Sequence, residues 1–228
     1  MKMARTLLNV CLVAATIFNA AIEATKTKYL SSECGDEVKV NGDVLIKLNS
    51  WFQPNCKVTL VPRSGDRLIA RFTYYHFNGF RNIIGLIANE CTFESIQLST
   101  SDSHYYFDED DGFCGAYKPS GLYDLGQKGY FSYNSKNGLT SSMKADLLVT
   151  EVFDKRNNTC ASGQFDCDKN NYCISDDVTC NGYDNCGNDR DEVKGCGLTT
   201  PIIIGIVVGC ICFVVLLIVI GVCIAKHR

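Results

Sequence analysis

The chain has 228 residues, a formal net charge of -3 and 14 cysteines. Its mean hydropathy is close to zero, but this mean combines two apolar ends with a polar, cysteine-rich middle. Because so many cysteines are unusual in a reducing cytosol, the chain is either exported and oxidised or binds metal. The sequence shows no basic tract, which removes the electrostatic case for a nucleic-acid partner.

The N-terminal segment has the order of features found in a secretory signal peptide. It contains Lys2 and Arg5, then a short apolar run over 7–18, then small residues. The apolar run is too short to span a bilayer. We therefore predict a signal peptide over 1–24. The candidate cleavage points follow Ala20, Ala21 and Ala24.

The C-terminal segment predicts one transmembrane helix. Residues 202–225 are 24 consecutive uncharged residues, which at about 1.5 Å rise per residue cross a hydrocarbon core of about 30 Å. The basic residues at 226–228 indicate a cytoplasmic tail, and hence a single-pass type I protein of the plasma membrane. A lipid anchor is the minor alternative. Gly205 and Gly209 form a small-xxx-small pair, which predicts a helix contact with a membrane-protein partner or a second copy.

The ten cysteines between the two ends form two groups of different density. In chain order the groups are Cys34, Cys56, Cys91 and Cys114, and then Cys160, Cys167, Cys173, Cys180, Cys186 and Cys196. The second group crowds into a segment that buries little apolar surface, so cross-links or a metal must stabilise it. The predicted division is a first domain over 25–154, a linker over 155–159, a second domain over 160–196 and a juxtamembrane segment over 197–201.

The first domain shows short apolar or alternating runs separated by turn residues, and no long helical period. Such runs predict a mainly β fold, an antiparallel sandwich that buries one face of each strand. The predicted strands fall within 37–48, 57–61, 68–75, 83–88, 93–98, 130–133 and 145–153.

The first domain resembles a CUB domain. The resemblance rests on the segments PNCKVTLVPRSGDRLIARF, CTFESIQL, GFCG and KADLLVTEVF. The disulfides that it implies are Cys34–Cys56 and Cys91–Cys114. Val58 stands where the family usually has Trp, which indicates a divergent member. Many CUB domains bind calcium through acidic side chains. Glu94 is the one residue here that clearly matches such a ligand, so whether this domain binds calcium is left open.

The second domain resembles a low-density-lipoprotein-receptor class A module over its whole length. The resemblance rests on Cys160, Phe165, Cys167, Cys173, Ile174, Cys180, Asn181, Gly182, Asp184, Asn185, Cys186, Asp191, Glu192 and Cys196. Spacing alone allows 15 pairings of six cysteines. The pairing that the resemblance implies is Cys160–Cys173, Cys167–Cys186 and Cys180–Cys196.

The same resemblance implies a structural calcium ion in the second domain. Its side-chain ligands would be Asn181, Asn185, Asp191 and Glu192, and its backbone carbonyl ligands Val178 and Tyr183. Two of the family's carboxylates are amides here, which predicts a weaker affinity than that of the full acidic set. The alternatives are an acidic disulfide knot without metal and a zinc site, which the lack of histidine in this segment disfavours.

Two smaller features complete the predicted ectodomain. Asn157 begins an Asn-Asn-Thr sequon in the linker, so we expect a glycan there. His76 and His104 are the histidines outside the C-terminal tail, and neither belongs to a catalytic motif. We therefore expect no enzymatic activity.

The combination of CUB domain, class A module and single span resembles the neuropilin- and tolloid-like auxiliary subunits, in a shorter form. The resemblance implies a cell-surface binding protein: a co-receptor, auxiliary subunit or adhesion molecule that recognises an extracellular protein or glycan. A structural surface-coat protein is the alternative. An endocytic lipoprotein-type receptor is disfavoured, because Val178 stands where such receptors have an aromatic residue and because the predicted tail is short.

Overall fold

The computed structural model describes most of the segment between the two apolar ends. The described residues are 25–49, 55–76, 91, 94–107, 112–115, 117–135, 143–168, 171–196, 207, 209–211 and 213–214. The chain divides into two compact units, Met1–Glu192 and Val193–Arg228. All of the described strands belong to the first unit.

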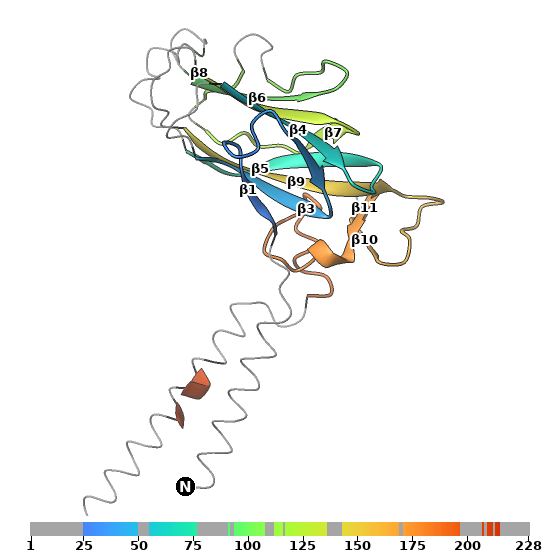
Figure 1. Ribbon diagram of the computed structural model, residues 1–228. Coiled ribbons are helices and arrows are strands. Elements are labelled where there is room, and N and C mark those ends of the chain that lie inside the picture. The colour runs from blue at the N-terminus through green and yellow to red at the C-terminus, as the bar shows by residue number, and fades with distance from the viewer. Residues whose placement is uncertain are drawn as a thin grey trace, which may run out of the picture. The chain divides into compact units, whose positions relative to one another are not determined.

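The first unit is built on two β-sheets (Figure 1). One sheet has four strands in the order β2-β4-β8-β6, in which β2 runs parallel to β4 and the other neighbours are antiparallel. The bounds of these strands are β2 (Glu37–Val40), β4 (Asn55–Pro62), β6 (Glu94–Thr100) and β8 (Gly129–Ser135).

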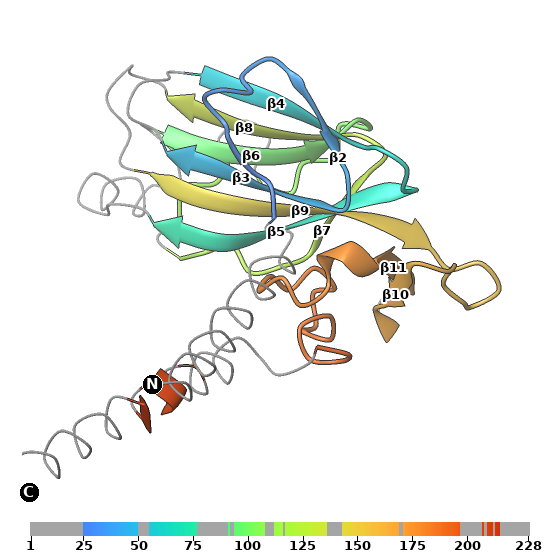
Figure 2. The ribbon, with the colours of Figure 1, turned by 60° about the horizontal axis from the view of Figure 1, so that its bottom comes forward.

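The other sheet has the long strand β9 (Lys144–Asp154) at its centre. Strands β3 and β5 pair antiparallel with the two edges of β9, while β1 extends the sheet beyond β3 and β7 extends it beyond β5. The bounds are β1 (Thr27–Tyr29), β3 (Asp43–Asn49), β5 (Arg67–His76) and β7 (Tyr123–Gly126). Figure 2 shows strands β4, β8 and β6 of the four-stranded sheet above β3, β9 and β5 of the other sheet, and side chains of both sheets share one buried core. The predicted mainly β sandwich is therefore confirmed, but the expectation that it is antiparallel throughout is wrong, because β1 runs parallel to β3 and β2 runs parallel to β4.

Alternating apolar residues along the strands build the core between the sheets. Val58 and Leu60 of β4 point inward, and the residues between and beside them face out. Phe131 of β8 and Leu147 of β9 meet them from the two sheets and are fully buried. Burial of side chains of this size contributes about 1.5–3 kcal/mol each. Val58, at the position where CUB domains usually have Trp, is thus a core residue.

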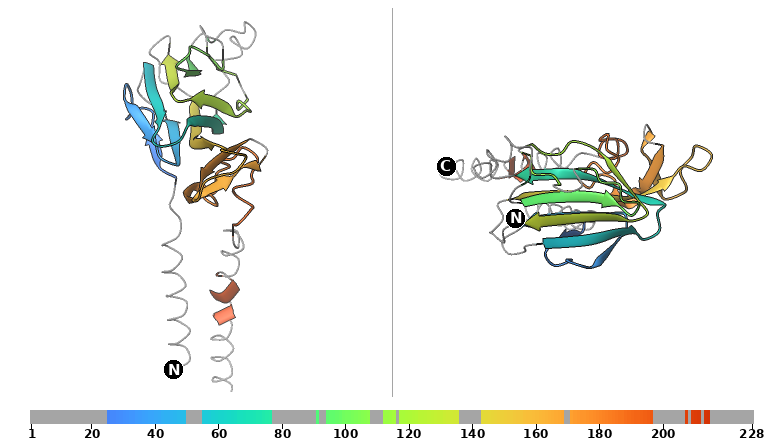
Figure 3. Two further views of the ribbon diagram at one scale, coloured as in Figure 1. Left: turned by 90° about the vertical axis from the view of Figure 1, so that its right-hand side faces the viewer. Right: turned by 90° about the horizontal axis from the view of Figure 1, so that it is seen from above.

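Strand β9 is longer than its neighbours, and the cysteine-rich second domain pairs with its end. Strand β11 (Tyr172–Ser175) is antiparallel to residues 152–154 of β9, and β10 (Gln164–Asp166) pairs with β11. Since β5 occupies one edge of β9 as far as Val152, β11 lies on the same edge as β3, which stops pairing at Thr150. The sandwich and the second domain therefore share one sheet, and Figure 3 shows the orange strands beside this end of β9.

The predicted linker over 155–159 forms a tight turn. Arg156 and Thr159 exchange two backbone hydrogen bonds, of 3.2 and 3.1 Å. Between them, Asn157 and Asn158 have left-handed φ angles of 54° and 61°. Asn at both central positions is typical of a two-residue hairpin turn. The linker thus returns the chain toward the sheet, and glycosylation of the exposed Asn157 stays a prediction.

Several predicted features lie on residues that the structure does not describe. They include the signal peptide at 1–24, the strand expected within 83–88 and most of the span at 202–225. The described residues of that span are helical. Within the part of the chain that the structure describes, no helix has the length and apolar character needed to cross a membrane. The span and the helix contact at Gly205 and Gly209 therefore stay predictions.

Candidate functional site

Disulfides cross-link both domains. The observed pairs are Cys34–Cys56, Cys91–Cys114, Cys160–Cys173 and Cys167–Cys186. Cys180 and Cys196 are also disulfide-bonded. The four observed pairs are the ones that the two family resemblances imply. The second domain therefore has a backbone that is fixed covalently at several points despite its small size.

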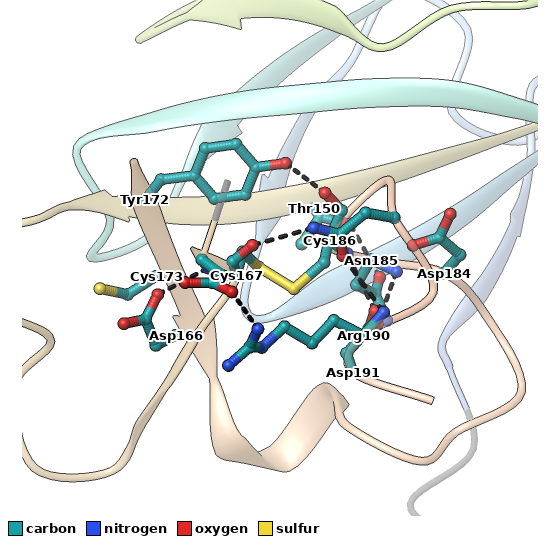
Figure 4. The surroundings of a disulfide bond; sticks show 12 residues. Thr150, Asp166, Cys167, Tyr172, Cys173, Asp184, Asn185, Cys186, Arg190 and Asp191 are labelled. Atoms are coloured by element: carbon teal, nitrogen blue, oxygen red, sulfur yellow. Dashed lines mark hydrogen bonds and ion pairs between the residues drawn. A yellow bond between two sulfur atoms is a disulfide. The ribbon is translucent and has the colours of Figure 1, made fainter. Parts of the chain in front are cut away.

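A second apolar core lies between the sandwich and the second domain. Ile69 of β5 and Val152 of β9 contribute to it from the outer face of the sandwich. Its members from the second domain are Cys167, Tyr172, Ile174, Val178 and Cys186. The Tyr172 hydroxyl donates a hydrogen bond of 2.6 Å to the Cys186 carbonyl (Figure 4). The second domain thus completes its core on the sandwich, and this arrangement positions the acidic loop, residues 178–192.

The side-chain amide of Asn185 lies at the centre of the acidic loop and is buried. Its Nδ2 donates to the carbonyl oxygens of Val178 and Tyr183 at 2.9 and 3.2 Å, and to Asn181 Oδ1 at 3.3 Å. Its Oδ1 accepts a hydrogen bond of 2.8 Å from the hydroxyl of Thr150 on β9 (Figure 4). One amide therefore joins the loop to itself and to the sandwich.

The two carboxylates of the predicted calcium site accept hydrogen bonds from backbone amides of the loop. Asp191 accepts from the amides of residues 185–186, at 2.7 and 3.3 Å. Glu192 accepts from the amides of residues 181–182, at 2.9 and 2.8 Å. Burial raises the pKa of Asp191, and the backbone hydrogen bonds oppose that rise. Both carboxylates are thus used to close the loop.

Asn181 connects the acidic loop to the start of β3. Its Nδ2 donates to Asp43 Oδ2 at 2.9 Å and lies 3.2 Å from Thr25 Oγ1. The Thr25 hydroxyl donates to the same Asp43 oxygen at 2.9 Å. Burial raises the pKa of Asp43, and the hydrogen bonds from its amide and hydroxyl partners oppose that rise. Asp43 is thus a buried acceptor of the sandwich that holds the second domain.

Two further contacts seat the loop on the sandwich. Arg71 of β5 forms an ion pair with the Asp184 carboxylate and donates a hydrogen bond of 3.2 Å to its carbonyl. A Cβ at Gly42, whose φ is +75°, would lie 2.8 Å from Val178 Cγ1, so the turn between β2 and β3 requires glycine. Val178 is 5 % exposed. The position that is aromatic in lipoprotein-type receptors is therefore buried against the sandwich.

The six predicted calcium ligands do come together in the loop, but their arrangement does not fit the ion. Calcium takes six to eight oxygen ligands at about 2.3–2.6 Å, whereas a nitrogen of Asn185 faces three of the predicted ligand oxygens. Among the described residues, no group of three or more His, Cys, Asp and Glu side chains could hold a metal. Calcium binding therefore stays a prediction of the resemblance that the donor geometry does not support.

The sequence did not reveal the sandwich residues that hold the loop. They are Thr25, Asp43, Arg71 and Thr150. One signal pointed to this face of the sheet: β9 carries apolar residues on both of its faces, as in Leu147, Leu148 and Val149. A continuous apolar run of this kind indicates a strand that is buried on both sides. The sequence therefore held a sign that something covers the outer face of β9.

Similarity of the chain to known proteins is found at the level of solved structures. No family model and no curated protein matches the chain. Among solved structures, the chain is similar to the CUB1-EGF-CUB2 domain of human MASP-1/3, with a TM-score of 0.39 and 14% identity over 52% of this chain and 42% of that chain. The chain thus spans less than half the length of that structure. The two-sheet sandwich and its two disulfides fit the CUB-like fold that the sequence predicts.

Proposed function

We propose that the chain is an extracellular binding protein of the cell surface, and that its two domains act as one rigid body. Four disulfides support the extracellular placement, because such bonds persist in oxidising compartments. The shared sheet and the second core support the rigid body. The signal peptide at 1–24 and the single span at 202–225 complete the proposal and rest on the sequence.

The observation that carries this proposal is an exposed apolar surface where the two domains meet. Leu122 is 39 % exposed and approaches Gly187 of the acidic loop. Tyr117, which is 86 % exposed, directly precedes Lys118 in the chain. Arg71 and Lys118 line a cavity of about 240 Å³ together with Leu122 and Gly187. Exposed apolar side chains beside basic ones are typical of protein-binding surfaces, in which Tyr and Arg are enriched. This surface therefore fits an extracellular protein as the partner.

Proximity labelling on live cells that express the tagged full chain tests the proposal. We expect the wild-type chain to label one protein in stoichiometric amounts, and Leu122→Ser to lose that partner, because Leu122 lines the cavity. Tyr29→Ser is the matched control, because Tyr29 is 47 % exposed on β1 and does not line the cavity. This control should keep the partner.

The other outcomes each point to a different conclusion. A partner that Leu122→Ser retains would contradict the assignment of this surface. A surface-exposed chain without any stoichiometric partner would favour the structural coat protein instead. Loss of labelling after glycosidase treatment of the cells would indicate a glycan ligand. A chain that never reaches the cell surface would contradict the proposed location.

A further inference from the structure

Three of the predicted calcium ligands point their oxygen atoms at one nitrogen. The carbonyl oxygens of Val178 and Tyr183 and the Oδ1 of Asn181 lie 2.9, 3.2 and 3.3 Å from Asn185 Nδ2. These are hydrogen-bond distances, and they are longer than the 2.3–2.6 Å or so of calcium–oxygen bonds. The amide nitrogen therefore occupies the point on which the ligand oxygens converge.

The surrounding hydrogen bonds determine which end of the Asn185 amide points into the loop. Two of the three oxygens are backbone carbonyls, which accept and never donate. The third belongs to Asn181, whose own nitrogen is directed to the Asp43 carboxylate. On the opposite side, the Thr150 hydroxyl can donate to Asn185 Oδ1. A reversed Asn185 amide would place its oxygen against three other oxygens, so the nitrogen must face inward.

The amides also remove the electrostatic demand for a cation. Carboxylates at positions 181 and 185 would add two negative charges beside the buried Asp43 and Asp191, and a divalent ion would offset them. Asn181 and Asn185 carry no charge, and their N–H groups supply the donors that the nearby oxygens need. The same two side chains reach Asp43 and Thr150 of the sandwich. The chemistry that replaces the ion is therefore also the chemistry that joins the domains.

We propose that the Asn185 amide takes the place of the calcium ion, so that the acidic loop keeps its fold without metal and serves as a fixed joint to the sandwich. The loop then serves to hold the second domain against strands β3 and β9 of the sandwich. This inference goes beyond the proposed function, because it holds whatever partner the exposed surface binds.

Hydrogen exchange of the purified full chain, read at the backbone amides of residues 171–196, tests the proposal. We expect equal exchange rates in excess chelator and at about 1 mM calcium, the weak end of the affinity range for extracellular modules. Slower exchange of the wild-type loop in calcium than in chelator would overturn the proposal.

Asn185→Asp gives the complementary test, because it exchanges the inward nitrogen for an oxygen with little change in size. Four oxygen atoms then face one another, so we expect fast exchange of the loop in chelator and slow exchange in calcium. Asn134→Asp is the matched control, since it makes the same chemical change at an exposed position of β8. It should behave like the wild-type chain in both solutions.

An Asn185→Asp loop that exchanges slowly in chelator would also overturn the proposal, because an inward oxygen would then be tolerated without a cation. If Asn185→Asp fails to fold, the wild-type titration still decides between a metal-free joint and a calcium site.

Discussion

The sandwich and the second domain are stabilised in different ways. The sandwich buries a continuous apolar core between two sheets, in which Phe131, Tyr133 and Leu147 are fully buried. The second domain supplies few apolar side chains, and these pack with Ile69 and Val152 of the sandwich. Its remaining stabilisation comes from disulfides and from the hydrogen bonds of the acidic loop.

This difference explains how so short a segment can be ordered. A chain of fewer than about 40 residues seldom folds without disulfides, a metal or a partner surface. Here the sandwich supplies the surface, and the end of β9 supplies a strand edge for β11. We therefore expect a one-way dependence, in which the second domain needs the sandwich to fold and the sandwich folds without the second domain.

Phe131→Ala should have the largest effect on stability. Phe131 is fully buried between the sheets, and its ring centroid lies 6.1 Å from that of Phe72. Truncation of such a residue costs about 3–5 kcal/mol, a large share of the 5–15 kcal/mol or so that stabilises a typical protein. We expect a lower free energy of unfolding by circular dichroism in denaturant, with the amides of both domains losing exchange protection together.

Phe165→Ala is the matched substitution in the second domain. Phe165 is half-buried and packs against the second core, so its truncation should cost less and should speed exchange mainly within residues 160–196. Protected amides in the second domain of a Phe131→Ala chain whose sandwich has unfolded would contradict the one-way dependence.

The sequence predicts the sandwich better than it predicts the joint. Strands β4 and β8 follow from a local pattern, since apolar residues at every second position bury one face wherever the strand lies. The ion pair between Arg71 and Asp184 joins residues 113 positions apart, and neither residue lies in a motif that indicates the other. Such a contact depends on how the second domain docks, which no local pattern encodes.

Within the site, too, the sequence indicates which residues lie together but not every contact that they make. Position and spacing identify Asn185 as a residue of the loop interior, as the class A resemblance implies. Its nitrogen faces that interior because the Val178 and Tyr183 carbonyl oxygens accept hydrogen bonds there, while Thr150, which lies 35 positions away in the other domain, contacts its oxygen. The sequence therefore indicates the residues of the site, whereas the contact of Asn185 with Thr150 depends on how the two domains pack.

Thr150→Val should have a smaller effect than Phe131→Ala. Thr150 is 2 % exposed, and its hydroxyl is the donor to Asn185 Oδ1. Without it a buried acceptor loses its partner, which costs about 1–3 kcal/mol, and we expect faster exchange in the acidic loop. Thr150→Ser keeps the hydroxyl and should retain most of the protection. Wild-type protection in Thr150→Val together with a loss of protection in Thr150→Ser would show that the methyl group matters and the hydrogen bond does not.

The smallest expected effect is at the ion pair between Lys155 and Asp166, which links the turn after β9 to β10 at 2.7 Å. The hydrogen bond from Lys155 lowers the pKa of Asp166, and the backbone amide of Asp168 lowers it further. The pair therefore stabilises the fold above the ordinary pKa of Asp, and this stabilisation is lost as the pH falls through the lowered value.

Lys155→Met keeps the apolar stem of the side chain and removes its charge, so an NMR titration should show the pKa of Asp166 moving up toward its ordinary value. The Asp168 amide remains in place, so the return should be incomplete. Lys39→Met removes the same charge from an exposed position on β2 and should leave the pKa of Asp166 unchanged. Equal shifts in the two variants would mean that the net charge of the chain, rather than the pair, sets this pKa. The free energy of unfolding should change little, because the Asp166 side chain is 42 % exposed and pairs that water reaches contribute little.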